Sequence, residues 1–585
     1  MNKYFERIER LRALMIGRGW DAVIVGGSDP HQSEYPASRW KQVEWLTGFT
    51  GEAGDVVITA DHAGLWTDSR YFIQAVEQLE GTGVELHKTR VPQEVPIPEW
   101  LFATLGPNAV VAVDSLCQSA GDFEALAGRF DAVGVPDMLS VLWEGRPGIP
   151  QTPVFRVQSG ESSEDKLAWL RIETAEAGAD AALITSLDEV AWLLNVRASD
   201  IEYNPLVISY LLVTPDAAKW FVLKEEIEDP DTEAVFASLR EEGVEVLPYQ
   251  QIDLALDSLD CTVAVDPSSL NASLAQMVGG HALSWTSPVQ LRKAMKNAYE
   301  QDCMRQVHVD DGVAMEKFLY WLEKSLDAGR TVTEWDAAVK LGQMRAAIED
   351  YCGDSFETIS AYGPGAALPH YITPHSDAPV LEPRGLYLVD SGGQYSRGTT
   401  DITRTIPLGP CSEEEIQHYT LVLKGHIALA MAKFPAGTPG CRLDVLAREP
   451  LWKAGLNFGH GTGHGVGFFL GVHEGPQDIR QNLNATPLYE GMITSDEPGL
   501  YVEGSHGVRH ENLLLCVPAE ETPFGEFLAF EPLTLCHFDT SIIDWTLLTE
   551  DEAFWLRAYN WSVYNRLSPL LEPEVAEWLK AKVSE

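Results

Sequence analysis

The sequence predicts an α/β protein with three domains. A chain of 585 residues is too long for one hydrophobic core, and its length alone favours three or four domains. Up to about residue 290, helix-period and strand-period segments alternate in two successive runs. Beyond that point the chain is rich in glycine and histidine and has strong strand patterns. We therefore expect two similar α/β domains followed by a different one.

The first domain opens with an amphipathic helix that leads into a strand, MNKYFERIERLRALMIGRGWDAVIV. Further strands are expected in GDVVITA, GLWTDS and AVVAVDS, and a helix in YFIQAVEQLEG. The stretch EGRPGIPQTPVFRVQSGESSEDK is rich in Pro, Gly and Ser and is typical of a linker. This places the first domain at residues 1–153.

The second domain shows the same succession of helix and short strands. The sequence has no tight period, which excludes a solenoid. The segment KLAWLRIETAEAGADAALI predicts a helix and then a strand, and LVISYLLVT, WFVLK, VEVLPY and TVAVDP predict further strands. A long amphipathic helical segment follows, beginning LRKAMKNAYEQD. We place the second domain at residues 154–308 and the third at residues 309–585, which end in a helical extension.

Composition restricts the function classes. A formal charge of −45 and a pI near 4.6 argue against nucleic acid or an anionic membrane as partner. Without 18 consecutive apolar residues, no segment is expected to span a membrane. The eight cysteines are scattered and form no CxxC pair, which indicates reduced thiols in a cytoplasmic protein.

Two predicted hairpins in the third domain each carry two carboxylates. The stretch LVDSGGQYSRGTTDITRTI has strand-forming residues at both ends and turn residues between them, with Asp390 and Asp401 eleven residues apart. A second hairpin is expected from ITSDEPGLY to GVRHENLLLCV, with Glu497 at the end of one strand and Glu511 in the other. Buried carboxylates are costly unless positive charge accompanies them.

Charge balance predicts which positive charges accompany the four carboxylates. Two Asp and two Glu carry −4, which two divalent cations would neutralise, with a neutral histidine completing the set. Such an oxygen-rich set suits Mn²⁺, and less firmly Co²⁺ or Fe²⁺. The histidine-bearing segment GHGTGHGVGFFLGVHEGP could instead be a flexible glycine loop or a phosphate cradle. No Walker A motif, GxSxG nucleophile elbow or HExxH helix accompanies it.

The segments DSGGQYSRGTTDITRT, GHGTGHGVGFFLGVHEGP, SDEPGLY and VRHEN together resemble the Xaa-Pro aminopeptidase branch of the pita-bread metallopeptidases. RWKQVEWLTGFTGEAGDVVIT and TSLDEVAWLLNVRASDIEYNPLVISYLLVT are similar to the first and middle domains of the long, three-domain cytosolic form. The resemblance covers most of the chain in the same order. It implies two creatinase-like N-terminal domains and a pita-bread catalytic domain.

The resemblance also implies roles for individual residues. The metal ligands would be Asp390, Asp401, His464, Glu497 and Glu511, and Zn²⁺ joins the metals that the site would accept. Four residues would act in catalysis, with the histidines positioning substrate and Glu497 carrying the proton: His370, His460, His473 and Glu497. Tyr501 and Arg509 would orient the ligands or the substrate. His510 replaces a residue that is more often aliphatic, and strand alternation points it away from Glu511.

The implied activity is release of the N-terminal residue from peptides with proline in second position, through a hydroxide that bridges the two metals. A prolidase-type dipeptidase would share these ligands, and a non-catalytic binding protein could share the fold. Peptides are thus the expected partners, and the resemblance implies a homodimer, with which the 17 tryptophans agree.

Overall fold

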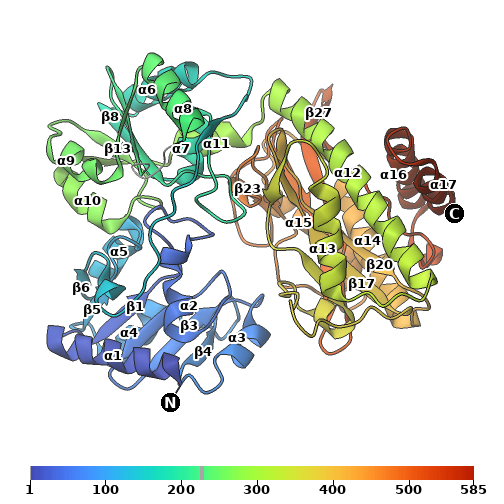
Figure 1. Cartoon of the computed structure of the whole chain (residues 1–585), viewed down its shortest axis with the longest axis horizontal. Helices are drawn as coiled ribbons and strands as arrows, with labels where there is room; N and C mark the ends of the chain where they lie inside the picture. Colours follow the sequence, from blue (N-terminus) through green and yellow to red (C-terminus); the bar gives the residue numbers. More distant parts are fainter. Residues whose placement is uncertain (1, 224–228, 585) are drawn as a thin grey trace. The chain divides into compact units, whose positions relative to one another are not determined.

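The computed structural model describes residues 2–223 and 229–584 and divides into two compact units, residues 1–289 and 290–585 (Figure 1). Lys224, the last residue of the predicted strand WFVLK, lies outside the described residues. The predicted α/β fold class is confirmed, since each unit combines helices with β-sheets.

The first unit contains two six-stranded sheets. One has the order β4(Glu85–Lys88), β3(Ala63–Thr67), β2(Asp55–Thr59), β1(Ala22–Val25), β5(Val110–Val113), β6(Asp131–Gly134). The other has the order β12(Val244–Pro248), β11(Ala218–Val222), β10(Ser209–Val213), β8(Ala181–Ile184), β13(Val263–Val265), β14(Ala282–Ser284). Both have parallel pairs at the two edges and antiparallel pairs at the same two internal positions. The prediction of two similar domains is therefore confirmed at the level of topology.

The sheets are covered by helices whose starts follow ordinary capping chemistry. Asn2 caps α1(Lys3–Arg18), Ser119 caps α5(Ala120–Ala127) and Ser162 caps α6(Ser163–Glu176), each by accepting a backbone N–H with its side chain. The remaining helices of this unit are α2(Gln42–Thr47), α3(Phe72–Gln78), α4(Ile97–Leu105), α7(Leu187–Leu194), α8(Pro230–Glu241), α9(Ile252–Asp257) and α10(Ala272–Val278).

The two halves of the first unit also share a turn. Asp114 directly follows β5, and Asp266 directly follows β13. The carboxylate of each aspartate accepts the backbone N–H of the residue two positions further along the chain. Each carboxylate also accepts an N–H from a distant segment, that of Met138 and Ser287 respectively. Strand β5 of the first sheet and the equivalent strand β13 of the second sheet therefore end in the same kind of turn.

Long helices lie beside the sheets of the second unit (Figure 1). These are α12(Ala298–Asp327), α13(Glu334–Arg345), α14(Glu413–Ala430), α15(Asp444–Lys453), α16(Glu550–Leu567) and α17(Pro573–Val583). The predicted helical segment from residue 291 is interrupted, because α11(Pro288–Ala294) ends before α12 begins at a capping box formed by Asn297 and Glu300. The predicted boundary at 308/309 falls inside α12 and stays a prediction.

The strands of the second unit form four groups. The order β16(Ile359–Tyr362), β17(Leu386–Ser391), β20(Ile402–Pro407) makes one sheet, and β15(Tyr351–Asp354), β18(Gly393–Tyr395), β19(Gly398–Thr399) another. The largest has the order β21(Lys433–Pro435), β28(Gly525–Pro532), β27(Asn512–Thr522), β24(Ile493–Asp496), β22(Gly463–Gly465), β23(Glu474–Ile479). β25(Gly499–Val502) pairs with β26(His506–Arg509).

Two further expectations concern the whole chain. All eight cysteines are free thiols, in agreement with the absence of a disulfide pattern. Within residues 2–223 and 229–584, none of the helices has the length and apolar character required to cross a bilayer.

Candidate metal centre

The first predicted hairpin is present and carries both aspartates into a buried space. β17 pairs antiparallel with β20 and sets Asp390 opposite Thr403. Every residue of β17 is buried, and the exposed fractions of Asp390 and Asp401 are 8% and 4%. One expectation was wrong: the segment between the strands is not only a turn, because β18 and β19 pair within it and form a second, shorter hairpin.

The second hairpin brings two glutamates to the same place. β24 pairs with β27 and sets Asp496 opposite Asn512, so that Glu497 and Glu511 both lie just beyond this pair. Glu511 also ties the two hairpins together: its N–H donates to the Thr403 carbonyl (3.1 Å), and its carboxylate accepts from the Thr403 hydroxyl (2.9 Å). Carboxylates from segments about 100 residues apart therefore share one site.

His464 completes the group. Its Nδ1 lies 2.9 Å from the Gly465 carbonyl, to which it donates, so the lone pair is on Nε2. That nitrogen lies 3.4 Å from carboxylate oxygens of both Asp401 and Glu497. Donor atoms of Asp401, His464 and Glu511 all lie within 4.8 Å of one another. This spacing allows a single cation to contact all three.

The glycines around His464 are required by close packing. A Cβ on Gly463 would meet the Ser495 carbonyl oxygen at 2.0 Å, and one on Gly465 would meet the Glu474 carbonyl oxygen at 2.0 Å. Because backbone atoms cannot yield as a flexible side chain can, only glycine fits between these strands. The alternative of a loosely held glycine loop is wrong for this part of the segment.

Electrostatics shows that the acids need positive charge. Burial raises the pKa of Glu511 well above its ordinary value, and the carboxylates of Asp401 and Glu497 raise it further. Burial likewise raises the pKa of Asp390 and of Glu497, although Arg509 opposes the rise in both. Among the described residues, the buried Oδ1 of Asp390 has no hydrogen-bond partner. Four crowded carboxylates with a spare acceptor and one imidazole lone pair fit divalent cations.

A hydrogen-bond chain connects the carboxylates to a histidine. Arg509 donates to the Asp390 carboxylate and, at 2.7 Å, to the Tyr501 hydroxyl. The Tyr501 hydroxyl lies 2.8 Å from Nε2 of His460, whose Nδ1 lies 2.7 Å from the Gly461 carbonyl. In the tautomer that this arrangement requires, Tyr501 donates to His460. Arg509 thus positions both Asp390 and, through Tyr501, the His460 ring.

The other two predicted histidines lie in segments that touch this group. The His473 ring packs edge-on against His464, with ring centroids 4.4 Å apart. His370 follows Pro369, whose carbonyl accepts from Arg509 at 3.4 Å. His510, expected to point away from Glu511, has an exposed fraction of 0% and packs edge-on against Tyr419.

Several contributing residues escaped the sequence reasoning. Thr403 lies two residues after Asp401, so strand alternation was a signal for it. Lys293 and Lys296 lie 3.0 and 2.8 Å from the buried carboxylate of Glu474, next to His473. Their distance along the sequence left no signal that would pair them with Glu474.

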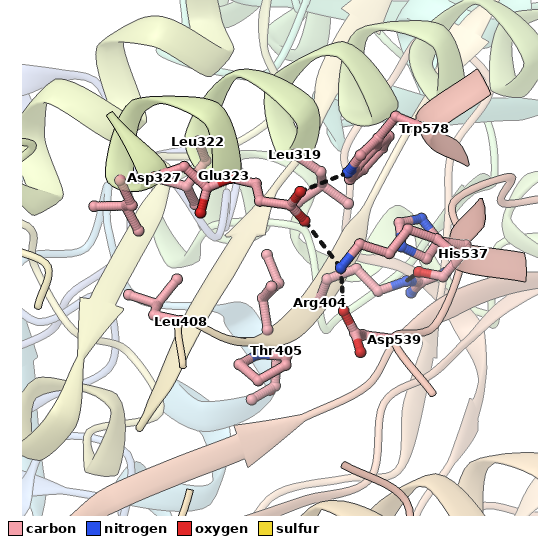
Figure 2. A pocket seen from close by; sticks show the side chains of 14 residues that line it. Leu319, Leu322, Glu323, Asp327, Arg404, Thr405, Leu408, His537, Asp539 and Trp578 are labelled. Carbon is pink, nitrogen blue, oxygen red and sulfur yellow. Dashed lines mark hydrogen bonds and ion pairs between the residues drawn. The ribbon is translucent and has the colours of Figure 1, made fainter. Parts of the chain in front are cut away.

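A separate pocket lies between α12, α17 and β20 (Figure 2). Its apolar wall includes Leu319 and Leu322, and Glu323 accepts from Trp578 (3.0 Å) and pairs with Lys582, which also pairs with Asp539. Among the described residues that line it, there is none of the ten predicted site residues. The pocket is therefore distinct from the candidate metal centre.

Comparison with known proteins places this geometry in a family. The model of metallopeptidase family M24 matches residues 302–518, and that of its C-terminal region matches residues 526–585. Creatinase/prolidase N-terminal domain models match residues 7–147 and 145–300. A probable Xaa-Pro aminopeptidase P from Laccaria bicolor is 39% identical, covering 99% of this chain and 93% of that protein. The chain belongs to the Xaa-Pro aminopeptidase P family.

Other members support the same assignment along the full length. Xaa-Pro aminopeptidase 1 from Dictyostelium discoideum is 36% identical, covering 99% of this chain and 96% of its own. The crystal structure of X-prolyl aminopeptidase from Caenorhabditis elegans, described as a cytosolic enzyme with a di-nuclear active site, is 35% identical. It covers 100% of both chains with a TM-score of 0.95. The predicted succession of creatinase-like domains and a pita-bread domain is thereby confirmed.

Proposed function

We propose that this chain is a metal-dependent aminopeptidase that releases the first residue of peptides with proline in second position. The observation that carries the proposal is the convergence of four carboxylates and the Nε2 of His464 on one buried spot. It occurs in a chain that matches an X-prolyl aminopeptidase over its whole length. The proposed ligands are Asp390, Asp401, His464, Glu497 and Glu511.

When bound, two divalent cations would supply an activated water and polarise the scissile carbonyl. The chain's own residues hold the ligands in place: Thr403 orients Glu511, Arg509 orients Asp390, and Ser495 donates to Glu497 at 3.1 Å. Because the donors are carboxylates and one imidazole, without a thiolate, Mn²⁺ is the proposed metal.

The three remaining histidines would act on the peptide substrate. An Xaa-Pro bond has no N–H, so ordinary strand-like recognition of the peptide fails at this position. In our proposal His370, His460 and His473 orient the substrate and stabilise the developing oxyanion, and Glu497 carries a proton to the leaving nitrogen. Tyr501 would hold His460 in the tautomer whose Nε2 is an acceptor.

The decisive experiment compares a peptide that begins Arg-Pro-Pro with a bare Xaa-Pro dipeptide, each with chelator and with added Mn²⁺. Cleavage of the longer peptide, lost with chelator and restored by Mn²⁺, supports the aminopeptidase. Cleavage of the dipeptide alone supports the prolidase alternative, and cleavage of neither at full metal occupancy leaves a binding protein. Asp401→Asn should abolish turnover, whereas Asp377→Asn, at an exposed aspartate, should not.

The description of the C. elegans relative as cytosolic supports a cytoplasmic location for this chain. A homodimer is proposed from family membership, and light scattering of the purified protein tests it: a mass near twice 64.5 kDa supports a dimer, and a mass near 64.5 kDa contradicts it.

A further inference from the structure

A second group of metal-binding side chains lies in the first unit, on the edge of its first sheet. His62 precedes β3, and Glu85 and His87 lie on β4, the edge strand that pairs with β3. Glu85 and His87 are two residues apart and therefore share one face of that strand. One donor atom from each of the three side chains can be chosen so that all lie within 4.8 Å of one another.

The distance between the two imidazoles fits a first-row transition metal. Nε2 of His62 lies 3.1 Å from Nε2 of His87, at hydrogen-bond distance, and the other ring nitrogen of His62, Nδ1, lies 3.8 Å from the Glu85 carboxylate. Two imidazole nitrogens on a tetrahedral Zn²⁺, each at about 2.0 Å, lie roughly 3.3 Å apart. Two histidines, one glutamate and a water form a donor set that Zn²⁺ commonly takes.

The surrounding residues hold the two rings in place. The His87 ring stacks on Trp66, with centroids 3.8 Å apart and planes 7° from parallel, and the His62 ring packs against Trp100 at 4.6 Å. Gly64 lies beneath the pair, and a Cβ there would meet Nε2 of His62 at 2.7 Å. The sequence thus leaves one strand position without a side chain, directly where the two imidazoles meet.

The protonation of the rings also suits a metal. Burial lowers the pKa of His62 and of His87, and His62 lowers that of His87 further. Both shifts favour the neutral form of the ring, which is the form that binds a metal. The side chain of Glu85 is 70% exposed, which leaves an open path for an ion from solvent.

Another buried group of similar composition differs in an informative way. Glu316, Cys536 and His537 are all buried, and the Glu316 carboxylate already accepts from both the backbone N–H and the Nδ1 of His537. Burial also raises the pKa of Cys536 well above its ordinary value, so its thiol is not a ready ligand. That group is buried and internally hydrogen-bonded, whereas the edge group has a solvent-exposed carboxylate beside its two imidazoles.

We propose that His62, Glu85 and His87 form a binding site for Zn²⁺ or a similar divalent transition metal, separate from the candidate metal centre. A bound ion would tie the β2–β3 turn to the edge strand β4. It would also cover part of an exposed sheet edge, a position at which unwanted strand pairing begins.

The test measures how many Zn²⁺ ions the metal-free full-length protein binds, with a competing chelator that keeps surface carboxylates from contributing. His87→Gln should bind one equivalent fewer than the unsubstituted protein. His281→Gln, at an exposed histidine outside the group, is the matched control and should lose none. Mn²⁺-dependent peptidase activity should be unchanged in both, so the count does not depend on the proposed function.

Glu85→Gln covers the case in which His87→Gln fails to fold, because the Glu85 side chain is mostly exposed. It should weaken Zn²⁺ binding at this site by at least ~10-fold, the loss that even a residue next to the ligands causes. Equal Zn²⁺ stoichiometry in the unsubstituted protein and in His87→Gln would overturn the proposal, as would unchanged Zn²⁺ affinity in Glu85→Gln.

Discussion

Arg509 donates to the Tyr501 hydroxyl at 2.7 Å while another of its nitrogens donates to the Asp390 carboxylate. One planar cation therefore fixes a proposed metal ligand and, through a phenol, a proposed catalytic histidine. Lysine offers a single charged centre and cannot make both contacts in this geometry.

Arg509→Lys should lower kcat/KM and the affinity for Mn²⁺, each by roughly 10–100-fold, because residues behind metal ligands contribute on that scale. The measurements are steady-state kinetics and a metal titration. Arg305→Lys is the matched control, since Arg305 pairs with Glu531 through two nitrogens in the same unit but away from the site. Equal losses in the two variants would contradict the role given to Arg509.

Tyr501→Phe should lower kcat by roughly 10–100-fold while the affinity for Mn²⁺ changes little. The variant removes only the hydroxyl that connects Arg509 to His460. Kinetics at saturating Mn²⁺ separates this effect from loss of metal. Tyr564→Phe, at a partly buried tyrosine of α16, should leave kcat unchanged. A normal kcat in Tyr501→Phe would show that His460 does not depend on this link.

Gly463→Ala should destabilise the protein by ~1–3 kcal/mol or more and reduce metal binding, because its Cβ would meet a backbone oxygen at 2.0 Å. Gly461→Ala is the matched control in the same segment: its Cβ would meet the nearest atom at 3.4 Å. Denaturant midpoints of both variants test this difference. Similar midpoints would mean that the strands around His464 are looser than the structure indicates.

Glu334 should make stability depend on pH. Its side chain is buried, and burial raises its pKa from 4.5 to about 7, although hydrogen bonds from Tyr371 and Tyr362 oppose the rise. A carboxyl group whose pKa is raised on folding stabilises the fold fully below pH 4.5, and this contribution is lost as the pH rises through about 7. The loss is on the order of 2 kcal/mol after screening by solvent.

Glu334→Gln should therefore have a larger free energy of unfolding than the unsubstituted protein at pH 8, with a smaller gain at pH 5. Denaturant unfolding at the two pH values measures this. Glu349→Gln, at an exposed glutamate, should show no such difference between the two values. A gain for Glu334→Gln that is equal at pH 5 and pH 8 would contradict the raised pKa.

The sequence predicted most of the architecture and the carboxylate hairpins because both depend on local patterns. Alternation and β-branched residues identified β17 and β20, and the glutamates followed from the same reasoning. β4 was missed because its sequence, ELHK, has no apolar alternation, and β18 was assigned to a turn because glycine dominates its start. A local sequence pattern does not identify a strand that is polar, or a strand whose conformation is set by packing.

The site was harder to predict where it depends on contacts across the chain. Nothing in the spacing of Arg509 and Asp390, 119 residues apart, indicates that they form an ion pair. The resemblance to a family indicated only that Arg509 orients the ligands, and it supplied the roles of the histidines. Lys296 and Glu474, 178 residues apart, had neither a local pattern nor a resemblance to suggest them.

The repeated sheet of residues 1–289 has a consequence for how this chain arose. Six strands in the same order and direction, closed at Asp114 and Asp266 by the same turn, are what duplication of one ancestral gene segment produces. The two copies have since diverged. The histidine pair formed by β4 and the turn before β3 has no counterpart in the second copy, where Lys219 lies opposite Glu245 in the strand pair at the same edge of the sheet. Residues that serve the same role in both copies are therefore those that the shared architecture needs, and residues found in one copy alone are later additions.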